Sequence, residues 1–185
     1  LMTSERRLVA RARLNQAGVG LFVPLMMDME AVFETPAFYD YERAMARMAN
    51  LSEMSSDPDQ GVAVLPMIAF DPYRGAGDGS RSGLDMVRDA IENRGFAGVK
   101  FYPPLGYRAI GNERSELPVL TKEDLDARCR ALFDYCLERR IPIVGHCTPH
   151  GMELSPSHKT GLNADPVYWS VLLSQPGMSE LRLCL

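Results

Sequence analysis

The chain has 185 residues, of which 46% are hydrophobic and 24% are charged, and its formal net charge is −4. This is the composition of a globular domain, and the lack of a basic stripe argues against nucleic acid as a partner. No apolar run approaches the roughly 18 residues of a membrane span, and residues 1–7 lack the apolar core of a secretion signal. We therefore expect a cytoplasmic protein that acts on a small-molecule substrate, with a homo-oligomer left open.

Strand-like apolar runs alternate with helical patterns along the chain. Thr121 and Asp124 have the spacing of a capping box at a helix start, and Asp165-Pro166 resembles a second start. This alternation predicts an α/β fold with a parallel sheet and right-handed crossovers. The predicted strands cover residues 19–26, 62–70, 98–102, 141–146 and 181–185, and the helical patterns lie near residues 9–14, 41–48, 84–91 and 125–137.

The number of strands bears on the type of α/β fold. An eight-stranded (β/α)8 barrel of the TIM type needs about 200 residues or more, and only five strand-like runs are visible. The last run reaches Leu185 without a turn after it, and a helical pattern is already under way at Val9. We therefore expect residues 1–185 to be a single incomplete barrel domain, about strands two to six. A complete five-stranded open sheet is the alternative.

Two polar residues stand where parallel strands are normally apolar on both faces. Lys100 is in the run 98–102 and His146 ends the run 141–146, and strand ends are where α/β barrels place their chemistry. His146 is a candidate metal ligand, or a buried histidine satisfied by a backbone carbonyl. Lys100 can carry a carbamate that binds metal, form a Schiff base, or pair with a buried carboxylate.

Long loops rich in Gly, Pro and Ser follow three of the strands, and long loops within compact domains are usually functional. Tyr102, Tyr107 and Arg108 follow Lys100, and an arginine with two tyrosines suits an anionic group. His150 lies in the loop after His146. We expect these four residues to contact substrate, with ordinary loop packing or an exposed histidine as the alternative. Asp28 can reach the same end of the sheet or cap a turn.

The four cysteines, at positions 129, 136, 147 and 184, show no CxxC spacing. In a cytosolic protein such cysteines are normally reduced, so we expect buried free thiols.

The segments 98–108 and 141–147 resemble those of the amidohydrolase superfamily, in its amidohydrolase-related (type 2) branch of metal-dependent hydrolases. Residues 64–72 resemble the third strand of that branch, and residues 181–185 resemble the strand before its second metal-site histidine. The resemblance implies a hydrolase whose metal-bound water cleaves a C–N or C–O bond. It favours Zn²⁺ as the metal, with Mn²⁺ or Fe²⁺ as alternatives.

Residue by residue, the resemblance reaches only part of the family's metal site. Lys100 and His146 match its strand-four and strand-five ligands. The His-x-His pair of strand one, the histidine of strand six and the acid/base aspartate of strand eight would lie outside this chain. Coding sequence on either side that supplies them would establish the family, and their absence from a complete gene would remove the hypothesis.

Three other functions remain open. The first is a non-oxidative decarboxylase of an aromatic or unsaturated acid on the same scaffold, with Arg108 as the carboxylate anchor. The second is a metal-free Schiff-base lyase that uses Lys100. The third is an inactive truncated fragment, for which we expect poor solubility because open strand edges would be exposed.

Overall fold

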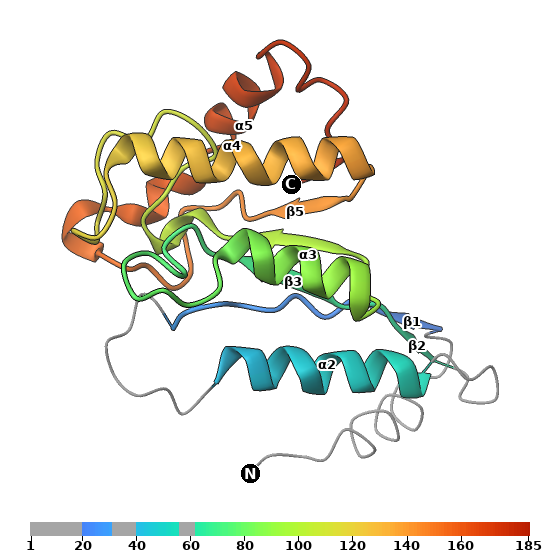
Figure 1. The fold of residues 1–185 in the computed structure, drawn as a ribbon. Helices are drawn as coiled ribbons and strands as arrows, with labels where there is room; N and C mark the ends of the chain where they lie inside the picture. Colours follow the sequence, from blue (N-terminus) through green and yellow to red (C-terminus); the bar gives the residue numbers. More distant parts are fainter. Residues whose placement is uncertain (1–19, 31–39, 56–61) are drawn as a thin grey trace.

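The structure is a computed structural model that describes residues 20–30, 40–55 and 62–185 (Figure 1). Its strands are β1 (Leu21–Phe22), β2 (Ala63–Val64), β3 (Met67–Phe70), β4 (Gly98–Phe101), β5 (Ile143–Gly145) and β6 (Leu183–Cys184). Its α-helices are α2 (Tyr41–Ser55), α3 (Gly83–Asn93), α4 (Lys122–Arg139) and α5 (Pro166–Leu173). Three short 3-10 helices are η2 (Pro103–Leu105), η3 (Pro156–His158) and η4 (Thr160–Ala164). The helix expected near residues 9–14 lies outside the described residues.

The strands form two parallel sheets in which sequence neighbours lie side by side. β1 pairs with β2, and the four-stranded sheet has the order β3-β4-β5-β6, with every pair parallel. A parallel bridge between Leu25 and Met67 joins the segment after β1 to β3. This arrangement confirms the predicted α/β class and parallel sheet.

The predicted run 62–70 is two strands rather than one. Pro66 separates β2 from β3, and because proline has no N–H it cannot donate to a sheet ladder. The hydrogen bonds to the segment that contains β1 nevertheless continue across this break, since Leu65 donates to Phe22 and Met67 donates to Pro24. The apolar pattern of the run continues across this break, which is why the pattern alone predicts one strand.

Local capping signals set the helix starts. The Thr121 side chain accepts from the Asp124 amide while the Asp124 carboxylate accepts from the Thr121 amide, which confirms the capping box expected at the start of α4. Ser82 and Asp85 make the same box at α3. Asp165 caps α5 by accepting from the Val167 amide, with proline at the first turn. These caps satisfy N–H groups that the helices cannot satisfy internally.

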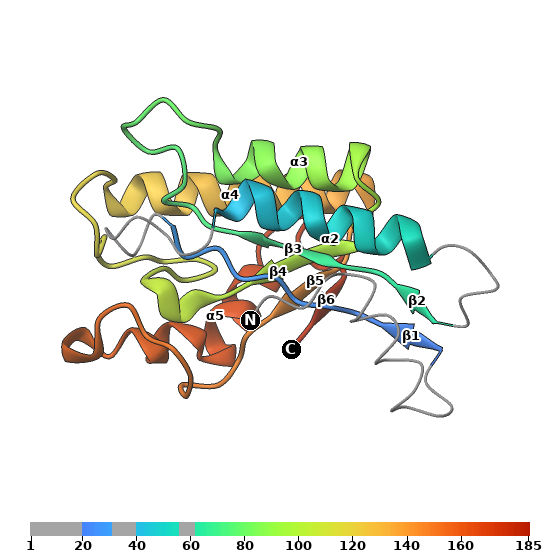
Figure 2. The same cartoon turned by 90° about the horizontal axis from the view of Figure 1, so that it is seen from below.

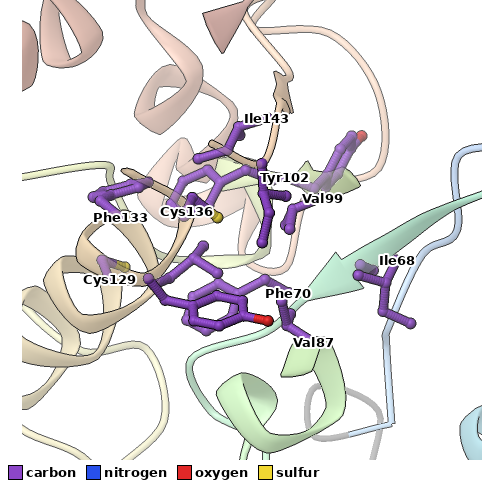
Figure 3. Packing of buried hydrophobic residues seen from close by; sticks show 14 of the residues in the cluster. Ile68, Phe70, Val87, Val99, Tyr102, Cys129, Phe133, Cys136 and Ile143 are labelled. Carbon is purple, nitrogen blue, oxygen red and sulfur yellow. The ribbon is translucent and has the colours of Figure 1, made fainter. Parts of the chain in front are cut away.

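Helices α2, α3 and α4 run along one face of the sheet (Figure 2). Val99, Phe101 and Ile143 are fully buried there, in the hydrophobic cluster drawn in Figure 3. The Phe101 ring lies 5.4 Å from Phe133 of α4 and 5.1 Å from Trp169 of α5, measured between centroids. This face is the main core of the protein.

Four residues in register form a row across the opposite face of the sheet. Ala69 pairs with Lys100, Lys100 with Val144 and Val144 with Cys184. Exposure rises along the row, from buried Ala69 and Lys100 through half-buried Val144 to exposed Cys184. The same face continues toward β1 with exposed apolar side chains at Leu21, Val23, Leu25 and Leu65.

All four cysteines are free thiols, as predicted. Cys129 and Cys136 are buried on α4, but Cys184 is exposed and Cys147 is half-buried, so the expectation of burial is wrong for Cys184. Cys184 belongs to the row on the face opposite the main core, which explains its exposure. None of the described helices is long and apolar enough to cross a membrane.

Candidate functional site

Lys100, Tyr102 and His146 lie together at the carboxyl ends of β4 and β5. Val144 pairs with Lys100, and because side chains alternate along a strand, His146 and Tyr102 continue on the face of that pair. The rings of Tyr102 and His146 lie 4.5 Å apart between centroids, and the Lys100 Nζ is 5.8 Å from the Tyr102 ring centroid. The structure thus brings three of the predicted site residues into one cluster.

Lys100 is a buried amine, with only 7% of its surface exposed. Burial lowers the pKa of the Lys100 ammonium, while the thiols of Cys147 and Cys184 act in the opposite direction. No carboxylate of the described residues forms an ion pair with Lys100, so the predicted structural ion pair is not formed within that part of the chain. A lowered pKa favours the neutral amine that carbamate and Schiff-base chemistry both require.

His146 is oriented by the backbone of the following loop. Its Nε2 lies 3.0 Å from the His150 carbonyl oxygen. A carbonyl can only accept, so Nε2 carries the proton and the lone pair of the neutral ring is on Nδ1. Histidines that bind metals usually donate their other ring N–H in this way, and a histidine that is merely satisfied makes the same bond. The geometry therefore fits both predicted roles.

The described residues supply only part of a metal site. Lys100 and His146 offer two nitrogen donors, whereas catalytic zinc sites use three protein ligands and an open position. Among residues 20–30, 40–55 and 62–185, no group of three His, Cys, Asp or Glu side chains could hold a metal ion. Further ligands would have to join these two donors.

Tyr107 and Arg108 make packing contacts. Tyr107 is fully buried, and its hydroxyl donates to the Phe70 carbonyl at 2.9 Å. The Arg108 guanidinium lies 4.5 Å from the Tyr168 ring centroid and donates to Glu113 at 2.8 Å. Neither side chain forms a hydrogen bond, ion pair or ring contact with Lys100 or His146 in the described part of the chain, and their roles in substrate binding stay predictions.

His150 is exposed, and its carbonyl rather than its ring reaches His146. Contact of the His150 ring with substrate stays a prediction.

A second polar cluster lies where the chain leaves β3 and the segment that follows β1. Of its residues, only Asp28 was expected from the sequence. Asp28 is almost fully buried, and both of its carboxylate oxygens accept from the guanidinium of Arg74. Arg74 also donates to Glu30 at 2.6 Å and lies 4.9 Å from the ring centroid of Tyr41. The available signal was Asp28 itself, since a buried carboxylate requires a charged partner.

Asp71 belongs to this cluster and was missed. It follows β3 directly, is fully buried, and accepts from the Tyr73 amide at 2.9 Å through Oδ1, while Oδ2 has no hydrogen-bond partner among the described residues. Burial, with the charge of Asp28 as the next cause, raises the pKa of Asp71 to about 8 against opposing effects of the Tyr73 amide, Arg74 and Arg128. The raised pKa favours the protonated, uncharged form of Asp71. Its place directly after an apolar strand, like that of His146, was the signal for it.

Two clefts open beside this second cluster. One, of about 330 Å³, is lined by Glu30, by Leu117 and Val119, and by the loop from Tyr73 to Ser80. The other, of about 230 Å³, lies between Asp71, the start of α3 and Arg128. Both adjoin the loop that follows β3.

No family model, curated protein or solved structure matches the chain.

Proposed function

We propose that the chain is part of a metal-dependent hydrolase of the amidohydrolase type, built on a TIM-type barrel. The observation that carries the proposal is the cluster of Lys100, Tyr102 and His146 on one face, at the carboxyl ends of two successive parallel strands. Barrels and open parallel sheets both bind ligands at this end of their strands.

Two features of the sheet support a barrel. Neighbouring strands follow the chain order without a reversal, and α2, α3 and α4 lie along one face (Figure 2). Open doubly wound sheets reverse their strand order and carry helices on both faces. In the proposed barrel, the row from Ala69 to Cys184 lines the interior, and the remaining strands come from outside the described residues.

In the proposed mechanism, His146 would hold the metal through a ring nitrogen, and Tyr102 holds the imidazole by ring packing. Lys100 acts as a second ligand or as an electrostatic neighbour. As a ligand, its neutral amine adds to CO2 and loses one proton, which gives a carbamate with oxygen donors. The bound metal, Zn²⁺ by preference, would supply a water of lowered pKa and polarise the scissile C–N or C–O bond.

A panel of small amides, lactones and esters tests the proposal on the product of the full reading frame that contains these residues. We expect Zn²⁺-dependent hydrolysis that falls by at least about a hundredfold in His146→Ala, the usual scale for loss of a catalytic group. Glu138→Gln changes an exposed residue of α4 outside the cluster, and is the control. Equal activity in the wild type and His146→Ala would remove the proposal.

The decarboxylase is distinguished by its product. Release of CO2 from aromatic or unsaturated acids, without cleavage of amides or esters, would replace the hydrolase. Arg108 would then be the carboxylate anchor, and Arg108→Lys should raise KM because lysine cannot bind a carboxylate in the same bidentate manner.

The burial of Lys100 also supports a Schiff-base lyase as a second candidate. An amine of lowered pKa attacks a carbonyl carbon, expels water and leaves an imine. Borohydride reduction in the presence of an aldehyde or keto acid would trap the substrate on Lys100, and mass spectrometry of the peptide would locate it. A trapped adduct that Lys100→Met abolishes would support this candidate, and tightly bound metal would count against it.

A further inference from the structure

The two rings of the candidate site are covered by the backbone of the loop after β5. The Met152 amide donates to the Tyr102 hydroxyl at 3.0 Å, and His146 Nε2 donates to the His150 carbonyl at 3.0 Å. Gly151 lies between these two contacts with a φ of +133°, and a Cβ at this position would lie 2.4 Å from the Tyr102 hydroxyl. Only glycine allows the backbone to lie so close to the ring.

The same loop is held at a second place, some distance along the chain. The Leu154 amide donates to the Pro104 carbonyl at 3.0 Å. The His158 Nδ1 lies 2.6 Å from Glu116 Oε2, and the second oxygen of Glu116 pairs with Arg114 at 2.8 Å. Arg114 closes the group by donating to the His158 carbonyl at 3.2 Å. We call residues 147–159 the lid, and Glu116, His158 and Arg114 the latch.

The two sides of the latch differ in how firmly they are held. The Glu116 side chain is only 6% exposed, and its amide donates to the hydroxyl of the buried Tyr73. The His158 side chain is 48% exposed. Glu116 is therefore held in place, and its carboxylate loses a charge-assisted hydrogen bond when His158 moves away, whereas Arg114 lies outside residues 147–159. The latch favours the closed lid for this reason.

The lid itself is weakly held, whereas its far end is firm. No residue from 147 to 159 is buried. The next element, η4, has buried residues at Thr160, Gly161 and Ala164 and packs against η2. A segment with few buried contacts, placed between β5 and a packed η4, has a low free energy of local opening. The hydrogen bonds to the rings, to the Pro104 carbonyl and within the latch, with the half-buried Leu154 against the core, therefore hold the lid closed.

We propose that residues 147–159 are a lid that covers the Tyr102–His146 pair, and that the Glu116–His158 latch controls its opening and so the access of small molecules. The proposal rests on the proposed function only in taking this ring pair as the site. Whether the lid opens, and whether the latch governs the opening, is measured without metal or substrate.

Amide hydrogen exchange followed by mass spectrometry tests the latch on the full chain. We expect the lid peptide, which contains the Met152 and Leu154 amides, to exchange about tenfold faster in Glu116→Gln and in His158→Ala, the scale of losing one charged hydrogen bond. The double variant should exchange no faster than either single variant, because both changes break the same contact. Glu138→Gln, at an exposed position of α4, is the matched control and should leave the lid unchanged.

If amide exchange in Glu116→Gln also becomes faster throughout α3 and α4, the substitution destabilises the whole fold. The test then depends on His158→Ala, which changes an exposed side chain. Lid exchange in His158→Ala equal to that of the control would overturn the proposal.

Chemical labelling of His146 tests whether the lid is a gate. Diethyl pyrocarbonate acylates accessible imidazoles, and the rate at His146 should rise in Glu116→Gln by about the same factor as the exchange of the lid. Gly151→Ala, which places a methyl group against Tyr102, should give the same rise with the latch intact. Faster lid exchange with unchanged His146 labelling in both variants would contradict a gating role. Failure of hydrolysis in the wild type would leave these results unaffected.

Discussion

At the scale of single residues, burial at the ends of the parallel strands favours the uncharged forms of two side chains, Lys100 and Asp71. Burial lowers the pKa of Lys100 and raises the pKa of Asp71, so each loses part of its ordinary tendency to carry charge. The sequence predicted Lys100 and His146 because they interrupt apolar runs. It did not predict Asp71, whose importance depends on the burial of its carboxyl group and on the nearby charge of Asp28, which are properties of the folded chain.

Asp71 makes the stability of the chain depend on pH. Its folded pKa of about 8 lies above the ordinary value near 4, so the folded state holds a proton that the unfolded state releases. The stability that this proton provides is complete below about pH 4 and is lost as the pH rises toward 8 and beyond.

Asp71→Asn replaces the carboxyl group with a neutral amide that still accepts from the Tyr73 amide. We expect it to be more stable than the wild type at pH 9, on the order of 3 kcal/mol, with little difference at pH 4. Urea unfolding from pH 4 to 9 measures this. Asp78→Asn, at an exposed residue of the same loop, is the control, and its free energy of unfolding should vary with pH from 6 to 9 as that of the wild type does. If the free energy of unfolding of Asp71→Asn varies with pH in that same way, Asp71 is already ionised in the folded wild type.

At the scale of elements, the signals that predicted correctly are local. The capping box at Thr121, the Asp165-Pro166 start and the apolar runs of β4 and β5 each depend on neighbours within a few residues. The predictions that were wrong concern where a strand is interrupted and which face of the sheet a residue lies on. The apolar run 62–70 is interrupted at Pro66, and the exposure of Cys184 follows from the face on which it lies.

The cap of α4 gives a prediction at this scale. Thr121→Ala removes the side chain that accepts from the Asp124 amide, which leaves an N–H of the first turn unsatisfied. We expect the free energy of unfolding to fall by about 1 kcal/mol, and chemical denaturation to show it. Thr121→Ser keeps the acceptor and should fall by much less. Equal losses in the two variants would mean that packing of the methyl group, rather than the cap, is responsible.

At the scale of the whole molecule, the two faces of the sheet differ in what covers them. One face packs on the helices, whereas the other has an exposed apolar group at Leu21, Val23, Leu25 and Leu65 beside the row that contains Lys100. An apolar face that water reaches is a site of association. The order of the strands was predictable from the chain, but the exposure of this face was not, because apolar runs do not show which side is covered.

Association of the 185-residue chain follows from this exposed face. We expect its mass by light scattering to rise with concentration, and Leu65→Lys to reduce the rise by placing a charge within the apolar group. Val171→Lys makes the same change at an exposed residue of α5, outside that face, and is the control. An equal effect of the two substitutions would mean that charge alone, rather than the exposed face, governs association.

The most direct test of the central claim, that Lys100 and His146 share one metal site, is the metal content of the full reading frame's product after dialysis against Zn²⁺. We predict at least one bound metal per chain in the wild type, lost in His146→Ala, reduced in Lys100→Met and unchanged in the exposed Glu138→Gln control. Loss of metal in Lys100→Met alone would make the lysine the sole ligand of the pair. Metal retained in full by both His146→Ala and Lys100→Met would contradict the account.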